Sequence, residues 1–185
     1  MHDLFYREDV FQDYDHGDKR RRGIDFTVDY QGRWYFHGLQ SPGPIKRKSL
    51  AALFGGAGEG FMAGKGLQTD SEGCYWLASP EGCYRVEVED VPFIITDFNI
   101  HNHDIDLLTN FDECIPLGPG HDVVLSAEPR QGVAVFYARV RDGLWARFST
   151  QAHNRFVNDV VRDVQEGYEF SSRGRTYRFS IDAER

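Results

Sequence analysis

The residues best suited to chemistry lie in one stretch of the sequence, where two histidines stand close to a carboxylate. His101, His103 and Asp104 fall within four consecutive positions, and imidazole with carboxylate is a ligand combination that suits Zn²⁺ or Mn²⁺. No recognised ligand spacing forces these side chains to converge, and a surface strand of alternating charge has the same pattern. A metal-assisted hydrolase that uses these three residues is therefore our alternative hypothesis, behind a binding function.

A second group of residues that can do chemistry is basic. Lys46, Arg47 and Lys48 stand at the start of a predicted helix, where the helix dipole disfavours cations but the free N–H groups can bind an anion. Acidic residues are abundant in this chain, so we favour salt bridges for these side chains over an anion site. The candidate ligand-binding residues are Lys46, Arg47, Lys48, Trp34, Glu89, Asp90, Arg141 and Arg147.

Other catalytic patterns are incomplete in the sequence. Gly64-Lys65-Gly66 follows a predicted helix instead of a strand, and it lacks the Ser or Thr of a phosphate-binding loop. The sequence has no Gly-x-Ser-x-Gly nucleophile motif. Cys74, Cys83 and Cys114 are interpreted as free thiols, because an odd and sparse set is a poor disulfide framework. We predict no catalytic residue and no cofactor.

The clearest strand pattern of the sequence must position these residues. Apolar and charged residues alternate from Tyr84 to Glu89, as in a strand with one buried face. The turn Ser79-Pro80-Glu81-Gly82 predicts that residues 75–78 pair antiparallel with this strand. Asp90-Val91-Pro92 ends the alternation, because proline has no N–H for a ladder. A third strand is expected from Phe93 to Ile100.

The remaining elements follow from the same patterns. We expect a hairpin of residues 24–30 and 33–38, strands at 114–117, 123–126, 132–140 and 144–148, and a last hairpin of 168–170 and 175–181. One helix is expected over residues 45–54. An amphipathic helix is expected over residues 150–165, with Ser149 or Thr150 as its N-cap and Phe156 and four valines as its apolar stripe. Valine has a poor helix preference, so this stripe is expected to pack on a sheet.

Composition excludes several classes of protein. With 185 residues, 41% of them hydrophobic, the chain can bury one substantial core or two small ones. The net charge of -8 disfavours binding to nucleic acid. No apolar run approaches the roughly 20 residues that cross a membrane, and the first residues lack the pattern of a secretory signal. We therefore expect a cytoplasmic protein without a membrane partner.

Five motifs occur in order along the chain. They are Arg33-Trp34-Tyr35, Ile45-x-Arg47-Lys48-x-Leu50-x-x-Leu53-Phe54, Tyr75-x-Leu77-x-x-Pro80, Val86-Glu87-Val88-Glu89-Asp90-Val91-Pro92-Phe93 and Val140-Arg141-x-Gly143-Leu144-x-Ala146-Arg147. With these motifs the chain resembles the bacterial family called domain of unknown function 1285. The fourth motif is the most specific, although the usual alanine of the family is Val91 here. The resemblance implies a cytosolic bacterial α+β protein of two small sheet-rich units, without an assigned activity or cofactor, and it transfers no catalytic residue.

We therefore predict an α+β fold of two small sheet-rich units, each with antiparallel hairpins and a packed helix, as in a roll or a partly open barrel. An N-terminal arm spans residues 1–23, the first unit residues 24–91 and the second unit residues 92–185. The favoured function is a non-enzymatic binding or regulatory module for a small anionic ligand or for a peptide strand at a sheet edge. A protein partner in place of the small ligand, and a homodimer, are further alternatives.

Overall fold

The computed structural model describes residues 24–37, 43–45, 66–79, 82–141 and 143–180. The chain divides into two compact units, Met1–Asp90 and Val91–Arg185. The N-terminal arm predicted at residues 1–23 and, apart from Ile45, the helix predicted at residues 45–54 lie outside the described residues. The packed helix expected in the first unit therefore has no counterpart in the described part of the chain.

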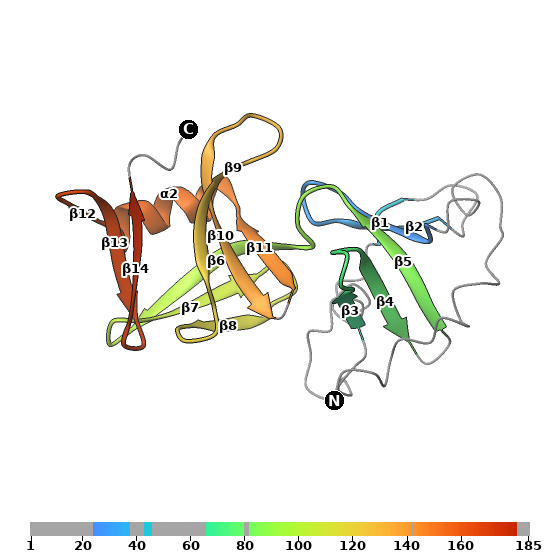
Figure 1. Ribbon diagram of the computed structural model, residues 1–185, viewed down its shortest axis with the longest axis horizontal. Helices are drawn as coiled ribbons and strands as arrows, with labels where there is room; N and C mark the ends of the chain where they lie inside the picture. The colour runs from blue at the N-terminus through green and yellow to red at the C-terminus, as the bar shows by residue number, and fades with distance from the viewer. Residues whose placement is uncertain (1–23, 38–42, 46–65, 80–81, 142, 181–185) are drawn as a thin grey trace. The chain divides into compact units, whose positions relative to one another are not determined.

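The first unit contains a five-stranded sheet in the order β2-β1-β5-β4-β3 (Figure 1). Its strands are β1 (Phe26–Val28), β2 (Trp34–Phe36), β3 (Gly66–Thr69), β4 (Tyr75–Ser79) and β5 (Gly82–Val88). The hairpin of β1 with β2 and the hairpin of β4 with β5 are both antiparallel, which confirms the two hairpins predicted for this region. In the second hairpin Ala78 faces Cys83, as the predicted turn requires. The parallel pairing of β1 with β5 joins the two hairpins.

One loop design occurs twice in this sheet. In each copy an aspartate accepts hydrogen bonds at Oδ1 from the backbone N–H groups two and four positions further on, at 2.8–2.9 Å. Its Oδ2 accepts a hydrogen bond from the aromatic side chain six positions further on, which is 3.0 Å away in one copy and 2.7 Å away in the other. The pairs are Asp29 with Tyr35 and Asp70 with Trp76. The loop sequence Asp-x-x-Gly therefore closes the hairpins β1-β2 and β3-β4 in the same way.

In its described residues the second unit contains two sheets and one helix. Its strands are β6 (Phe93–His101), β7 (Asp104–Thr109), β8 (Cys114–Leu117), β9 (Val123–Ala127), β10 (Ala134–Arg141), β11 (Leu144–Phe148), β12 (Arg162–Val164), β13 (Gly167–Ser172) and β14 (Arg175–Ser180), and its helix is α2 (Thr150–Asp159). Six strands form a curled sheet in the order β8-β7-β6-β11-β10-β9, and the last three form a sheet in the order β12-β13-β14 (Figure 1). Antiparallel pairs dominate, and β11 beside β6 is parallel.

Aromatic side chains hold α2 between these two sheets. Phe156 is fully buried, and its ring lies 5.2 Å from Phe98, 5.1 Å from Phe148 and 5.0 Å from Phe170. Edge-to-face contacts of this kind add to the burial of the rings. The core of the second unit therefore joins the six-stranded sheet, α2 and β13.

The predicted helix over residues 150–165 is too long. Ser149 is the N-cap, as predicted, and its hydroxyl accepts a hydrogen bond from Ala152 N–H. The helix ends at Asp159, and Val164 belongs to β12 instead. Only Ala152 and Phe156 are buried in the helix, and Val157 is exposed, so most of the predicted valine stripe does not form. Branching at Cβ favours strand over helix, and here this preference prevails.

Candidate functional site

The basic residues predicted from the sequence are not gathered in one described site. Lys46, Arg47 and Lys48 lie outside the described residues. Trp34 is a core residue of the first unit, with 1% of its surface exposed and its ring 6.3 Å from that of Phe26. Its burial indicates packing, which is the usual role of a large aromatic residue.

Two candidate carboxylates stand at the end of β5. Glu89 accepts a hydrogen bond from the Tyr30 N–H at 2.9 Å, and so ties the β1-β2 loop to β5. Burial, and then the negative charge of Asp90, raise the pKa of Tyr75. Glu89 and Asp90 thus interact with Tyr30 and Tyr75 of the same unit.

Arg141 and Arg147 belong to the second unit. Arg141 forms an ion pair with Glu113 at 2.7 Å, and its guanidinium lies 5.3 Å from the ring centre of Phe93. Glu113 is held by this pair through Oε1, whereas its buried Oε2 has no hydrogen-bond partner among the described residues. Burial raises the pKa of Glu113, although the charge of Arg141 acts in the opposite direction. Arg147 is buried on β11 opposite Tyr137.

The predicted metal ligands surround the turn between β6 and β7. His101 faces Asp104 at the end of this hairpin, and Asn102 and His103 form the turn with φ values of 52° and 72°. Asp104 accepts a hydrogen bond from the Arg173 N–H at 2.9 Å. Among the residues that the structure describes, no three His, Cys, Asp or Glu side chains come together to hold a metal ion. His101, His103 and Asp104 therefore do not come together as a metal site in the described part of the chain.

A hollow of about 390 Å³ lies in the second unit between the end of α2, the β6-β7 hairpin and the last sheet; we call it the β12 hollow. It is lined by Ile100, His103, Ile105, Asp159, Val160, Arg162, Glu169, Phe170 and Ser171. Its volume is within the range of pockets that hold small ligands. Four of the lining side chains are apolar, and four can be charged.

The charged side chains of the β12 hollow are unequally paired. Asp159 forms an ion pair with Arg155 at 3.6 Å, and Glu169 forms one with Arg178 at 3.1 Å. Across the last sheet, Arg162 stands directly opposite Glu169 on β13. Within the described residues the Arg162 side chain makes no ion pair or hydrogen bond. The hollow therefore presents a cation that a ligand can use, beside two acids that already have arginine partners.

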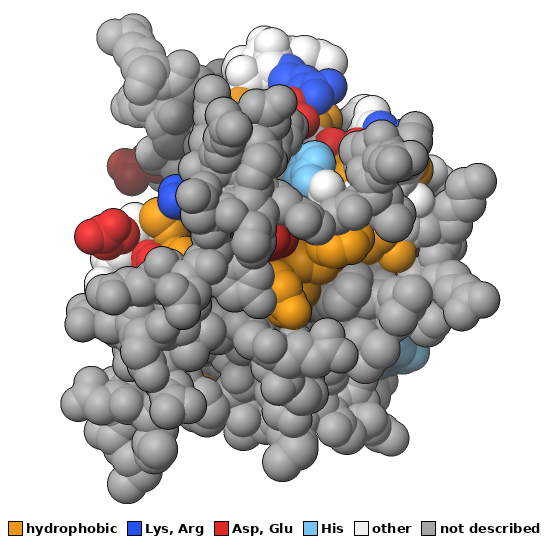
Figure 2. Space-filling model, turned by 90° about the vertical axis from the view of Figure 1, so that its right-hand side faces the viewer, with side chains coloured by type: hydrophobic (Ala, Val, Ile, Leu, Met, Phe, Trp, Pro, Cys, Tyr) orange, Lys and Arg blue, Asp and Glu red, His pale blue; other side chains and the backbone are white. Residues whose placement is uncertain are grey.

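A second hollow, of about 600 Å³, lies in the first unit and is lined by Thr27, Val28, Asp29, Tyr35, His37, Glu87, Val88 and Glu89. On the face shown in Figure 2, acidic and histidine side chains lie beside hydrophobic ones. Asp29 is already occupied by Arg33, at 2.7 Å, and by Tyr35. The hydroxyl of Tyr35 on β2 thus helps Asp29 to close the β1-β2 hairpin. This hollow is acidic, which is the opposite of what an anionic ligand requires.

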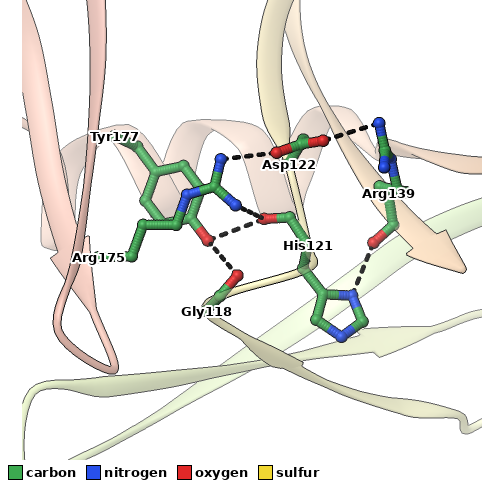
Figure 3. Close-up of polar contacts among 6 residues, drawn as sticks. All are labelled: Gly118, His121, Asp122, Arg139, Arg175 and Tyr177. Atoms are coloured by element: carbon green, nitrogen blue, oxygen red, sulfur yellow. Dashed lines mark hydrogen bonds and ion pairs between the residues drawn. The ribbon is translucent and has the colours of Figure 1, made fainter.

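A polar network joins the two sheets of the second unit (Figure 3). Asp122 forms ion pairs with Arg139 on β10 at 2.7 Å and with Arg175 on β14 at 2.6 Å. The Tyr177 hydroxyl lies 3.0 Å and 2.8 Å from the carbonyl oxygens of Gly118 and His121, which share its single proton. We call Gly118, His121, Asp122, Arg139, Arg175 and Tyr177 the polar latch. Because every charged group in it has a partner, its geometry indicates a structural role.

The polar latch also fixes the orientation of one histidine. His121 Nδ1 is 2.9 Å from the Arg139 carbonyl oxygen, which can only accept, so Nδ1 carries the proton. The hydrogen bond from Arg175 lowers the pKa of Asp122. This ionised carboxylate is therefore stabilised between two strands that are far apart in the sequence.

Sequence reasoning missed both the β12 hollow and the polar latch. The apolar spacing predicts Arg162 inside a helix, and Asp122, Arg139 and Arg175 carry no local pattern that brings them together. The only available signal was the beta-branched composition of residues 160–164, which favours a strand at that point.

Comparison with known proteins relates this sheet-rich chain to a described protein family. Residues 92–179 match the family described as protein of unknown function (DUF1285), C-terminal domain. The chain therefore carries the C-terminal domain of the DUF1285 family, and the family resemblance drawn from the sequence is confirmed. No functionally curated protein matches the chain.

Two solved structures share the fold. The crystal structure of a DUF1285 family protein from Silicibacter pomeroyi DSS-3 is 20% identical, with a TM-score of 0.70, and covers 86% of this chain and 81% of that chain. The crystal structure of a DUF1285 family protein from Shewanella baltica OS155 is 23% identical, with a TM-score of 0.52, and covers 73% of this chain and 91% of that chain. In the described residues, none of the helices has the length and apolar character of a membrane span.

Proposed function

We propose that this protein is a non-enzymatic binding module whose β12 hollow takes a ligand with an anionic group and an apolar body. The observation that carries the proposal is the position of Arg162. Its guanidinium lines the hollow without an ion-pair partner in the described part of the chain, whereas Asp159 and Glu169 are held by Arg155 and Arg178. Hydrogen bonds between a guanidinium and an anion are among the stronger ones in proteins.

The apolar lining supports the second half of the proposal. Ile100, Ile105, Val160 and Phe170 contribute to the wall of the hollow, and Ile100 is 47% exposed. Burial of an exposed apolar surface by a ligand is favourable at roughly 25 cal/mol for each Å². His103 also lines the hollow, and its ring offers a further N–H group for the anionic group.

This site replaces the arrangement expected from the sequence. Arg141 is engaged by Glu113, and Lys46, Arg47 and Lys48 lie outside the described residues, so the β12 hollow has more support among the described residues than the basic residues expected from the sequence. The hydrolase alternative has no group of three metal ligands among the described residues. A bacterial source, a cytoplasmic location and a homodimer stay predictions.

Titration of the ¹⁵N-labelled full chain with 4-methylpentanoate, a small carboxylate with an apolar body, tests the proposal. We expect saturable shifts confined to amides that border the β12 hollow. Arg162→Gln should weaken binding at least tenfold, because one charge-assisted hydrogen-bonding partner is lost. Arg85→Gln removes an exposed arginine of the first unit and should leave binding unchanged. Shifts outside the hollow, or equal affinity of Arg162→Gln, would contradict the proposal.

A further inference from the structure

We infer that the ligand of the β12 hollow is the C-terminal end of an extended peptide with an apolar last residue, which adds as a strand beside β12. This inference rests on the proposed function and identifies its anionic group as a terminal carboxylate. Capture of a C-terminal carboxylate beside an exposed strand edge is a recurring mode of peptide recognition.

The first observation is that the hollow offers acceptors as well as a cation. The N–H groups of Val160 and Val161 both donate to the Phe156 carbonyl at the end of α2. No backbone N–H in the described part of the chain donates to the carbonyl groups of Val157, Asn158 and Asp159. Of these three residues Asp159 lines the hollow, so its carbonyl and carboxylate oxygens are acceptors there. A simple carboxylate leaves such acceptors unused, whereas a peptide brings N–H donors next to its carboxylate.

The second observation is the open edge of β12. This strand pairs with β13 on one side, and no described strand pairs with its other side. Val164 faces Gly167 across the two-residue turn, so the alternation of an antiparallel ladder directs the N–H and C=O of Asp163 away from β13. Arg162 is the preceding residue of the same strand. A peptide whose carboxylate reaches Arg162 thus has backbone groups within reach of this edge.

The third observation is the distribution of exposed apolar side chains. The large hydrophobic residues that are exposed in the described part of the chain are Ile100, Val124, Val133, Val157, Val164 and Tyr168. Four of the six belong to elements that surround the hollow, namely β6, α2, β12 and β13. Of these four, Ile100 lines the hollow itself, and an exposed apolar side chain at the wall of a pocket is a surface that a ligand can cover. The last side chain of the peptide fits against Ile100 and Phe170 at this place.

Charge sets a preference for the preceding residues of the peptide. Asp163 and Glu166 are exposed, and neither forms an ion pair within the described residues. A lysine or arginine upstream of the apolar last residue therefore meets these carboxylates, while the terminal carboxylate meets Arg162. The chemistry that fits this surface is a basic segment that ends in an apolar residue with a free carboxylate.

Fluorescence polarisation with labelled peptides tests this inference on the full chain. The probe is Lys-Thr-Lys-Thr-Val-Leu with a free carboxylate, and the matched control is the same peptide with a C-terminal amide. We expect the acid to bind at least tenfold tighter than the amide. Arg162→Gln should lower the affinity for the acid to that for the amide and leave the affinity for the amide unchanged.

Asp163→Pro separates strand addition from capture of the carboxylate. Proline removes the outward N–H and is tolerated at sheet edges, whereas Asp163→Asn keeps this donor. We expect Asp163→Pro to lose at least tenfold in peptide affinity while it binds 4-methylpentanoate as the unmodified protein does. Preserved amide shifts outside β12 would show that the variant is folded.

The outcomes distinguish this inference from the function on which it rests. If 4-methylpentanoate binds and the acid and amide peptides bind equally or not at all, the peptide inference is overturned and the proposed function stands. If Asp163→Pro binds the peptide as well as the unmodified protein does, strand addition beside β12 is overturned. If neither the carboxylate nor the peptide binds, both proposals fall.

Discussion

At the scale of single residues, Gly167 shows how a backbone position can specify its residue. Its φ is +151°, and a Cβ atom placed on it would lie 2.0 Å from the Phe179 carbonyl oxygen on β14. A backbone atom cannot move aside as the end of a flexible side chain can. The helix predicted over residues 150–165 would put Gly167 just beyond a helix end, whereas Gly167 begins β13 and allows β14 to approach.

Gly167→Ala should therefore destabilise the second unit by about 3 kcal/mol or more, because the clash adds to the backbone strain. Gly174→Ala is the matched control: Gly174 also has a positive φ, of +72°, but a Cβ atom placed on it would have no neighbour within 4 Å. Gly174→Ala should lower the free energy of unfolding by about 1–2 kcal/mol, because it introduces the backbone strain without the clash. Urea unfolding of both variants measures the difference, and equal losses would contradict the explanation.

Glu113 carries a buried carboxylate oxygen without a partner among the described residues. Burial raises the pKa of Glu113 above its ordinary value, so the ionised form is less favourable in the folded than in the unfolded chain. The resulting cost is absent below the unfolded pKa and is complete once the pH rises above the folded pKa. Glu113→Gln should thus be more stable than the unmodified protein at pH 7, and this advantage should vanish near pH 4.

Thermal unfolding across this pH range checks the prediction for Glu113. The Gln side chain retains an oxygen that can accept from Arg141, so the variant changes the charge more than the shape. A loss of stability at pH 7 would show that the ion pair with Arg141 outweighs the burial of the carboxylate. An advantage that persists at pH 4 would show that the charge of the carboxylate is not its cause.

At the scale of the elements, local patterns predicted most strands and their turns. Alternation and Pro-Glu-Gly placed the hairpin of β4 and β5 with the correct pairing of Ala78 and Cys83. The same reasoning placed the last hairpin, whose turn has positive φ values at Arg173 and Gly174. It failed where the helical spacing of apolar residues and the backbone preference of valine disagree. The apolar spacing after Phe156 predicts a longer helix, but Val160 caps the end of α2 and Val164 lies in β12. Local backbone preference decided that case.

The polar latch is an element-scale device, because it connects β14 to the loop between β8 and β9. Tyr177→Phe removes the hydroxyl that two carbonyl groups accept from and leaves them without this donor. We expect a loss of about 1–3 kcal/mol in the free energy of unfolding. Tyr168→Phe on the neighbouring strand is the control, since Tyr168 is exposed and should lose almost nothing. Comparable losses in chemical denaturation would refute a special role for Tyr177.

The stability that the polar latch contributes should depend on pH through the carboxylate of Asp122. Its pKa is lowered, chiefly by the hydrogen bond from Arg175, so the folded chain holds the carboxylate ionised at a pH where the unfolded chain is protonated. The stabilisation is present above the unfolded pKa, near 4, and is lost as the pH falls through the folded pKa. Asp122→Asn should therefore flatten the decline of stability with acid. Asp163→Asn, an exposed carboxylate without an ion pair among the described residues, should leave this decline unchanged.

At the scale of the whole molecule, the pairings that define the sheets are non-local. β1 lies parallel to β5, and β6 lies parallel to β11, so the five-stranded and the six-stranded sheet are each joined through segments that are far apart in the sequence. Periodicity describes one segment at a time and contains no information on such pairings. The β12 hollow was beyond prediction for the same reason, because its lining comes from β6, β7, α2, β12 and β13.

The family motifs show a similar limit. The motif Val86 to Phe93 is the most specific of the five, but the matched C-terminal domain begins at residue 92. The motif Val140 to Arg147, which is weak alone, lies inside the matched region and forms part of β10 and β11 in the curled sheet. Its conspicuous residues are explained by packing: Leu144 and Ala146 are almost completely buried.

The division of the chain leads to a prediction for the second unit by itself. Its fully buried residues include Phe93, Phe98, Phe148 and Phe156, and the ring contacts of Phe156 are all made within the unit. A core of this kind in about 95 residues is sufficient for an independently folded domain. A protein of residues 91–185 should therefore show dispersed amide resonances and a single cooperative unfolding transition.

Phe156→Ala in this shorter protein provides the control for a cooperative core. The ring joins α2 to both sheets, so its removal should cost about 3–5 kcal/mol and lower the midpoint of the same single transition. The binding experiments on the β12 hollow should then give the same affinities in the shorter protein as in the full chain, because all lining residues belong to it. A non-cooperative fragment, or binding that requires residues 1–90, would show that the second unit is not a self-sufficient binding domain.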